Sequence, residues 1–227
     1  MLKVALIEEE RRGAELMEVW GGEGAAPVFA RDGGALLMER SVGGKSLAAM
    51  SVSGGDDDAT RIICSVANRL HACKAISPSS LVPLSRWFRA LDTAAAARGG
   101  IFAECAKIAT DLLADPMDIA TLHGDIHHDN ILDFGLRGWL AIDPKALVGE
   151  RTFDFANLFC NPDARAADGA RFDRRAGIVC QAAGIDRTRL LKWVFAWSGL
   201  SAAFSIEDGE PHDAALAIAQ LIKERLL

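Results

Sequence analysis

Short apolar runs and one amphipathic stretch alternate over residues 1–40 of the chain. Residues 1–7 form an apolar run of the length of a short buried strand, and residues 8–20 repeat apolar side chains at helical spacing behind a leading group of glutamates. Two further apolar runs, at 26–30 and 34–40, flank the turn-forming sequence RDGG. The pattern therefore predicts three strands and one helix.

From residue 47 onward the apolar positions recur mostly at helical spacing. The helical stripes cover residues 58–75, 85–114, 188–205 and 213–227. Residues 131–144 instead hold two short apolar runs around a glycine-containing turn, which predicts a small β-hairpin. The change from strands to helices predicts an α+β protein with a small lobe at residues 1–40 and a larger, mainly helical lobe at 41–227.

Composition and charge narrow the classes of protein that this pattern can serve. Of the 227 residues, 50% are hydrophobic and 25% are charged, a balance typical of a globular chain that can bury a core. The net charge of −6 argues against a nucleic-acid partner, whose phosphates need a basic face, and it suits a cationic ligand.

The sequence gives no sign of a membrane partner or of secretion. No stretch reaches the ~20 apolar residues that a membrane-spanning helix needs, and the apolar run 1–7 is followed at once by charged residues, unlike a signal peptide. The five cysteines form no CxxC pair, which favours reduced thiols. We therefore expect a cytoplasmic protein.

Residues 122–130, LHGDIHHDN, concentrate the candidate chemistry and allow three interpretations. A zinc site would use His123, His127 and Asp129, but Gly124 and the turn signals that follow disfavour the helix on which HExxH zinc sites are built. A solvated surface loop without function is the second interpretation. The third is the catalytic loop of a phosphate-transferring enzyme.

Phosphoryl transfer accounts for most of these polar residues at once. Such a site needs a carboxylate that orients the attacking hydroxyl, and Asn and Asp oxygens that hold Mg²⁺ against the phosphates. Asp125 and Asn130 have the spacing of the kinase catalytic loop, and the predicted hairpin would bring Asp143 back beside Asn130. The sequence GGKS at 43–46 is not a phosphate-binding loop, because the first glycine of that motif is missing ahead of Lys45, and it predicts a turn that leads into a helix.

At these residues the chain resembles the aminoglycoside phosphotransferases, whose fold is similar to that of protein kinases. Their HGDxHxxN loop and the aspartate that follows it match LHGDIHHDNIL and GWLAIDP. Residues 33–40, 138–162 and 200–219 resemble the branch that phosphorylates streptomycin at its 6-hydroxyl, often grouped with hydroxyurea resistance kinases. The resemblance covers essentially the whole chain and implies a two-lobe, protein-kinase-like fold.

The resemblance also implies ATP and Mg²⁺ as cofactors and a role for each matching residue. Asp125 would be the catalytic base, and Asn130 and Asp143 would be the Mg²⁺ ligands. The loop would be supported by His123, His127 and Asp154, whereas His128 and Asp129 are expected to be solvated.

The nucleotide is expected to contact the small lobe. Lys3 falls where the family has the strand lysine that pairs with the α- and β-phosphates, and its partner on the following helix would be Glu10 or Glu15, with Glu10 favoured. Backbone groups of Glu39 and Arg40 would form the hinge that hydrogen-bonds adenine.

The substrate implied by the resemblance is a cationic aminoglycoside. The acidic stretch at 205–210 supplies Glu207, Asp208 and Glu210 as candidate contacts, and an ordinary exposed loop is the alternative interpretation of that stretch.

The chain is thus expected to be an ATP- and Mg²⁺-dependent kinase for an alcohol group of a small molecule, such as the 6-hydroxyl of streptomycin. The alternative is a non-catalytic kinase-fold remnant that binds a ligand or partner, because family members carry a further β-hairpin before the lysine strand and this sequence starts two residues before Lys3. Such a chain would lack part of its nucleotide cover, and its exposed strand edge would favour a homodimer.

Overall fold

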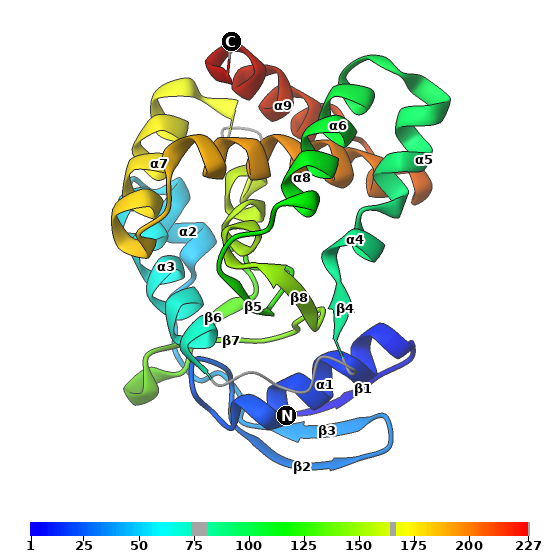
Figure 1. Ribbon diagram of the computed structural model, residues 1–227. Helices are drawn as coiled ribbons and strands as arrows, with labels where there is room; N and C mark the ends of the chain where they lie inside the picture. The colour runs from blue at the N-terminus through cyan, green and yellow to red at the C-terminus, as the bar shows by residue number, and fades with distance from the viewer. Residues whose placement is uncertain (74–80, 164–166, 227) are drawn as a thin grey trace.

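A small antiparallel sheet and one helix form the N-terminal part of the computed structural model, which describes residues 1–73, 81–163 and 167–226 (Figure 1). The strands β1 (Leu2–Val4), β2 (Val28–Asp32) and β3 (Ala35–Met38) lie in the order β1-β3-β2, and the helix is α1 (Glu8–Trp20). This part therefore has the three strands and one helix expected for it, although the first strand is shorter than the apolar run 1–7.

Alternation along the small sheet decides which side chains face the inside. Lys3 pairs with Leu36 in the β1–β3 register, and Leu36 and Met38 are buried. Leu2, Val4 and Leu37, on the opposite face, are exposed. Because successive side chains point to opposite faces of a strand, Lys3 shares the inward face with the buried residues.

The larger part of the chain is mainly helical and lies above the small sheet in Figure 1. Its helices are α2 (Leu47–Val52), α3 (Asp56–Ala72), α4 (Leu84–Trp87), α5 (Arg89–Arg98), α6 (Gly100–Ala114), α7 (Gly169–Ala183), α8 (Arg187–Glu207) and α9 (Asp213–Leu226). The stripe at 85–114 is thus divided into three helices. The GGKS sequence precedes α2, and its Ser46 Oγ accepts a hydrogen bond from the Ala49 amide as a helix N-cap.

Helix α8 is the centre of this helical part of the chain. It packs against α5, α6 and α9, and its middle is buried on every side. Trp193 meets the rings of Phe88 and Phe153 at centroid distances of 6.0 and 5.6 Å. Burial of such large aromatic side chains is the main favourable contribution to this core.

Short strands and 3₁₀ turns connect the helices to the region facing the small sheet. These are β4 (Val82–Pro83), β5 (Ile119–Leu122), β6 (Ile131–Asp133), β7 (Trp139–Ala141) and β8 (Leu147–Glu150), with 3₁₀ helices η2 (Gly135–Arg137), η3 (Arg151–Phe155) and η4 (Asn157–Cys160). β6 and β7 pair antiparallel around η2, so the predicted hairpin is confirmed.

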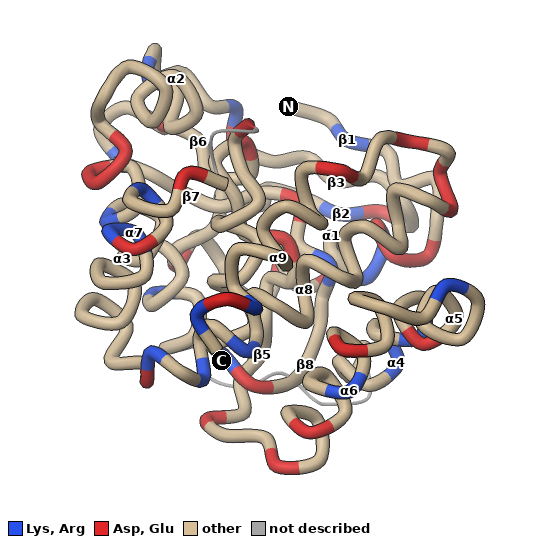
Figure 2. Tube along the Cα trace, turned by 90° about the horizontal axis from the view of Figure 1, so that it is seen from above, with Lys and Arg blue, Asp and Glu red and all other residues tan. Residues whose placement is uncertain are grey.

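Charge is distributed rather than collected on one face. Figure 2 shows acidic and basic residues interspersed along the trace. Across the ranges that the structure describes, no helix is both long and apolar enough to cross a membrane.

Candidate active site

The loop 123–130 joins β5 to β6 and faces the small sheet. Asn130 directly precedes β6, and a single residue, Ile142, separates Asp143 from the end of β7. The Ile142 amide donates to the Asn130 carbonyl oxygen over 2.9 Å, which extends the hairpin ladder to the two candidate ligands. The hairpin therefore brings Asn130 and Asp143 to one end of the same pair of strands, as their spacing predicts.

A cleft of about 200 Å³ lies between the small sheet and this loop. Its lining includes six residues with predicted roles, namely Lys3, Glu10, Asp125, His127, Asn130 and Asp143. Apolar side chains of α1 and β3, including Met17 and Met38, line it as well. A cleft with apolar walls and a few convergent polar groups is the usual form of a small-molecule site.

The Asp125 carboxylate is held by asparagine amides. Asn130 Nδ2 donates to Asp125 Oδ2 over 3.1 Å and to the Asp125 carbonyl oxygen over 2.9 Å. Asn157 Nδ2 donates to Asp125 Oδ1 over 2.8 Å. Because the nitrogen of Asn130 is engaged by Asp125, the Oδ1 of Asn130 is the atom on its side chain that can serve as a ligand.

Lys3 and Asp143 form an ion pair across the cleft, with Nζ and Oδ1 2.8 Å apart. Asp143 has a φ of 58°, in the left-handed region, so the chain turns sharply where its carboxylate meets Lys3. The expected pairing of Lys3 with a helix glutamate is not present in the structure. Glu10 accepts a hydrogen bond from the Leu6 amide over 2.6 Å, which lowers the pKa of Glu10, and Glu15 faces Arg31.

A different lysine makes the contact to α1. Lys145 Nζ lies 2.7 Å from Glu9 Oε1, and both residues line the cleft. Burial would lower the pKa of Lys145, but the hydrogen bond to Glu9 and the nearby carboxylates of Asp125 and Asp143 raise it. Neither Lys145 nor Glu9 was predicted as a site residue, although Lys145 directly follows the matched IDP sequence and Glu9 directly precedes Glu10.

His123 lies buried beneath the loop. Its Nε2 donates to the Ile142 carbonyl oxygen over 2.8 Å, and its Nδ1 accepts from the Asp125 amide over 3.2 Å. These partners assign the neutral tautomer with the proton on Nε2, and burial lowers the pKa of the ring. The ring stacks on Trp20 at a centroid distance of 6.1 Å. His123 thus connects the loop to the hairpin and to α1.

His127 lies in the cleft, whereas Asp154 is buried beneath the loop. His127 Nε2 lies 3.9 Å from Asp125 Oδ1 in the cleft. Asp154 is buried, and its carboxylate accepts from the His123 amide over 2.9 Å, the Gly124 amide over 2.7 Å and His71 Nε2 over 2.8 Å. Gly124 has a φ of 85° and packs closely on Leu147, a position that a larger residue would strain.

Two expectations about exposed residues have different outcomes. Asp129 is exposed as expected. His128 is not solvated: it is 1% exposed and its Nε2 lies 3.4 Å from Arg175 Nη2. Burial, and then the Arg175 charge, lower the pKa of His128 to about 3. The sequence had no local signal for this burial, because Arg175 comes from α7.

The hinge and substrate candidates lie at the periphery. The Glu39 amide donates to the Pro27 carbonyl oxygen and its carboxylate pairs with Arg137, so the carbonyl of Glu39 is the backbone group left for a ligand, while Arg40 is exposed. Three acidic residues at the end of α8 are exposed and are not among the residues that line the cleft, namely Glu207, Asp208 and Glu210.

The zinc interpretation finds no support in the geometry. Among the residues that the structure describes, no three His, Cys, Asp or Glu side chains converge in a way that would hold a metal ion. The oxygens of Asn130 and Asp143 are a different kind of donor set, one that suits Mg²⁺.

The family described as aminoglycoside/hydroxyurea antibiotic resistance kinase matches residues 1–209 of the chain. A streptomycin 3''-kinase of Klebsiella pneumoniae is 49% identical over 224 residues, which cover 96% of this chain and 84% of that protein. A streptomycin 6-kinase of Streptomyces griseus is 29% identical over 92% of this chain and 71% of its own length.

A solved structure gives the fold. The ternary complex of an aminoglycoside phosphotransferase with ADP and hygromycin B superimposes with a TM-score of 0.64 over 94% of this chain and 82% of that chain, at 12% identity. The expected α+β, protein-kinase-like fold is thereby confirmed.

Proposed function

Since the chain belongs to the aminoglycoside/hydroxyurea antibiotic resistance kinase family, we propose that it transfers the terminal phosphoryl group of ATP, with Mg²⁺, to a hydroxyl of an aminoglycoside. The observation that carries this proposal is the convergence of Asp125, Asn130 and Asp143 at one cleft. An acceptor hydroxyl bound in this cleft would lie near the Asp125 carboxylate. The groups suited to the metal and to the phosphates line the same cleft.

In this proposal Asp125 orients the hydroxyl and accepts its proton as the new bond to phosphorus forms. The oxygens of Asn130 and Asp143 would hold Mg²⁺, because the nitrogen of Asn130 is already engaged and a carboxylate–amide oxygen pair is the donor set that this ion prefers. The ion would neutralise the charge that develops on the phosphates.

Two ammonium groups in the cleft favour a polyanionic ligand. Lys3 and Lys145 both line it, so the phosphates would meet two positive charges there. We assign Lys3 to the α- and β-phosphates and the carbonyl of Glu39, with the neighbouring Arg40 backbone, to adenine. Glu10 then holds the segment between β1 and α1 through the Leu6 amide rather than pairing with Lys3.

Streptomycin is the acceptor that the relatives favour. Sequence motifs alone predict its 6-hydroxyl, whereas the 49% identical relative is a 3''-kinase, so we propose the 3''-hydroxyl as the phosphorylated group. Glu207, Asp208 and Glu210 are proposed to attract the cationic guanidino groups. A cytoplasmic location, where ATP is supplied, belongs to the same proposal.

We propose that residues 1–40 and 41–227 are two lobes with the cleft between them. The apolar outer face of the small sheet, with Leu2, Val4 and Leu37 exposed at and beside the edge strand β1, further suggests pairing with a second copy. Sedimentation of the protein with Val4→Lys as the comparison tests this, since an unchanged mass distribution would oppose a dimer through β1.

Phosphorylation of streptomycin by the purified protein, with ATP and Mg²⁺, tests the function. Asp125→Asn should lower the rate at least about 100-fold, because the base is lost, while the exposed neighbour Asp129→Asn should stay within about twofold. NMR of the product distinguishes the 3''-hydroxyl from the 6-hydroxyl. Wild-type protein that phosphorylates no aminoglycoside would instead favour the non-catalytic remnant.

A further inference from the structure

Asn157 reaches the proposed base from outside the matched catalytic loop. It begins η4, 32 residues beyond Asp125, and its Nδ2 lies 2.8 Å from Asp125 Oδ1. Asn130 Nδ2 lies 3.1 Å from the other oxygen, Oδ2. Each oxygen of the Asp125 carboxylate therefore accepts a hydrogen bond from a different asparagine.

The orientation of the Asn157 amide is fixed by its other end. Its Oδ1 accepts from Trp197 Nε1 over 3.1 Å and from Asn161 Nδ2 over 3.0 Å. An indole nitrogen can only donate, so the atom that faces Trp197 must be the amide oxygen. The nitrogen then necessarily faces Asp125. A flipped amide would set donor against donor at Trp197 and oxygen against the carboxylate at Asp125.

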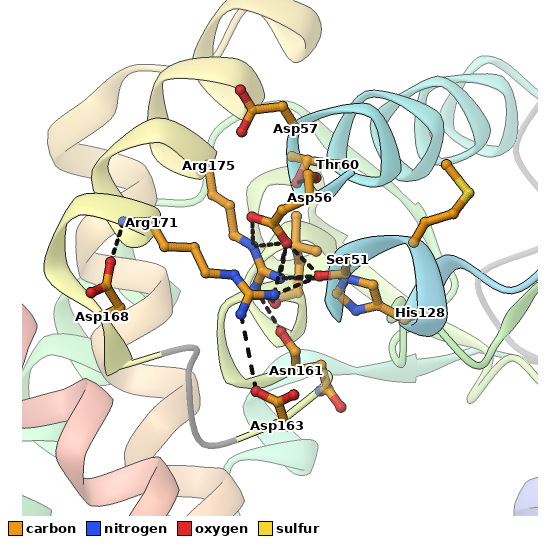
Figure 3. A network of polar contacts seen from close by, with 12 residues as sticks. Ser51, Asp56, Asp57, Thr60, His128, Asn161, Asp163, Asp168, Arg171 and Arg175 are labelled. Atoms are coloured by element: carbon orange, nitrogen blue, oxygen red, sulfur yellow. Dashed lines mark hydrogen bonds and ion pairs between the residues drawn. The ribbon is translucent and has the colours of Figure 1, made fainter. Parts of the chain in front are cut away.

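A buried ion network holds η4 in place. Arg175, from α7, is 1% exposed and donates through Nη1 to the carbonyl oxygens of Leu158 and Asn161 over 2.8 and 2.6 Å. Its charge is balanced by Asp56, at 2.7 Å. Figure 3 shows Arg175 and Arg171 gathered on Asp56, with His128 and Asn161 both below Asp56 in the view. The same guanidinium thus contacts η4 and the loop that carries Asp125.

We infer that Asn157 is a positioning residue for Asp125, a role that rests on the proposed kinase function. Because the orientation of its amide is fixed, Asn157 holds one oxygen of the Asp125 carboxylate. The carboxylate then meets the acceptor hydroxyl in a single orientation. The terminal torsion of an aspartate is broad and roughly two-fold, so a carboxylate held at one oxygen can still turn. Donors on both oxygens remove that freedom. Orientation of this kind accelerates a reaction without contributing to ground-state binding.

Asn157→Asp is the sharpest test, because it changes one donor into an acceptor and keeps the shape. The new carboxylate can still accept from Trp197 and Asn161, so the fold is retained, whereas its contact with Asp125 becomes repulsive. We expect kcat for streptomycin phosphorylation to fall about 10- to 100-fold, with both KM values within about twofold. Asn157→Leu should behave similarly, and Asn157→Gln should recover part of the rate if its longer amide reaches Asp125.

A second readout separates positioning from general damage. A misplaced base leaves the nucleotide bound while the acceptor is badly aligned, so the ratio of ATP hydrolysis to streptomycin phosphorylation should rise in Asn157→Asp. Asn68→Leu is the matched control, because the Asn68 amide of α3 donates to the Ala182 carbonyl oxygen of α7 and Asn68 does not line the cleft. That variant should keep kcat, KM and the hydrolysis ratio of the wild type.

An unchanged kcat and hydrolysis ratio in Asn157→Asp would overturn the inference, as would a loss of rate explained wholly by raised KM values. Crystal structures of the wild type and Asn157→Leu decide the point without turnover. We expect the Asp125 carboxylate to rotate or to occupy two orientations in the variant, and a carboxylate that stays in place would refute the role. If the wild-type protein phosphorylates no aminoglycoside, the proposed function fails while this structural comparison still decides the contact.

Discussion

Lys145 and Glu9 form an ion pair that joins the segment after β7 to helix α1, with Nζ and Oε1 2.7 Å apart and the two residues 136 positions apart in the sequence. The Lys145 amide also donates to the His123 carbonyl oxygen over 2.7 Å, which fixes the lysine backbone against the loop 123–130. Lys145 is therefore held both by its backbone and by its ammonium group, which lies close to Asp125 and Asp143.

Removing this ammonium should impair phosphoryl transfer. Lys145→Met keeps much of the side-chain length but not the charge, and we expect kcat/KM to fall at least about 10-fold, since a preorganised cation near developing phosphate charge is lost. Steady-state kinetics measure the effect. Lys223→Met is the matched control, because Lys223 forms a similar 2.7 Å pair with Glu104 between α9 and α6, and its rate should stay within about twofold.

A glycine allows α1 to pack closely against Pro144 at the wall of the cleft. A Cβ at Gly13 would run into the carbonyl oxygen of Pro144, well inside contact distance, so Gly13→Ala should push α1 outward. We expect it to destabilise the protein by about 1–3 kcal/mol in urea unfolding and to lower the transfer rate. The exposed helical Gly177 of α7 has open space around it, and Gly177→Ala should be neutral or stabilising by up to about 1 kcal/mol. Equal effects at the two glycines would contradict the packing argument.

The buried carboxylate of Asp56 should be essential for stability. It accepts from Arg171 and Arg175 over 2.8 and 2.7 Å. Asp56→Asn would remove the carboxylate charge that both buried guanidinium groups share, and Arg171 would keep its longer 4.0 Å contact with Asp163. The expected loss is about 3–5 kcal/mol in the free energy of unfolding. Asp57→Asn, one residue away, removes only a long 3.7 Å contact to the exposed Arg174 and should cost less than about 1 kcal/mol.

The buried carboxylates of Asp56 and Glu150 should make the stability of the fold sensitive to acid. Burial alone would raise the pKa of Asp56, but its hydrogen bonds with Arg175, Arg171 and Ser51 lower it far below the ordinary value of 3.8. The pKa of Glu150, ordinarily 4.5, is likewise lowered by Arg189 against the effect of burial. Because the unfolded chain binds these protons more readily, the stabilisation is complete above pH 4.5 and is lost as pH falls through the folded pKa values. Unfolding measured from pH 7 to pH 3 should show this decline, and a flat profile would exclude it.

The sequence predicts well those parts of the site whose positions follow from local geometry. The convergence of Asn130 and Asp143 needs only a tight hairpin between them. Asp125 lies beside Asn130 because the two are five positions apart in the same short loop. The helix at Glu8–Trp20 is also local, because its apolar spacing and leading acidic residues suffice.

Contacts that depend on how distant elements pack could not be predicted from the sequence. Three consecutive glutamates begin α1, and only the angle at which α1 meets the Asp143–Lys145 segment decides that Glu9, rather than Glu10, meets a lysine. His128 is a polar residue in a polar stretch, yet Arg175 and Asp56 bury it from two other helices. The contact of Asn157 with Asp125 likewise arises only when η4 packs against the loop.

If Asp143 holds Mg²⁺ as proposed, the ion and Lys3 compete for one carboxylate, because Lys3 Nζ already lies 2.8 Å from Asp143 Oδ1. A cation that binds Asp143 exchanges with Lys3, which must then find another anion or release β1 from the large lobe. In the proposed function the phosphates of the nucleotide are that anion, so binding of each ligand would offset the cost of binding the other. By thermodynamic reciprocity the two should bind cooperatively, and the metal alone should bind more weakly than the metal–nucleotide complex.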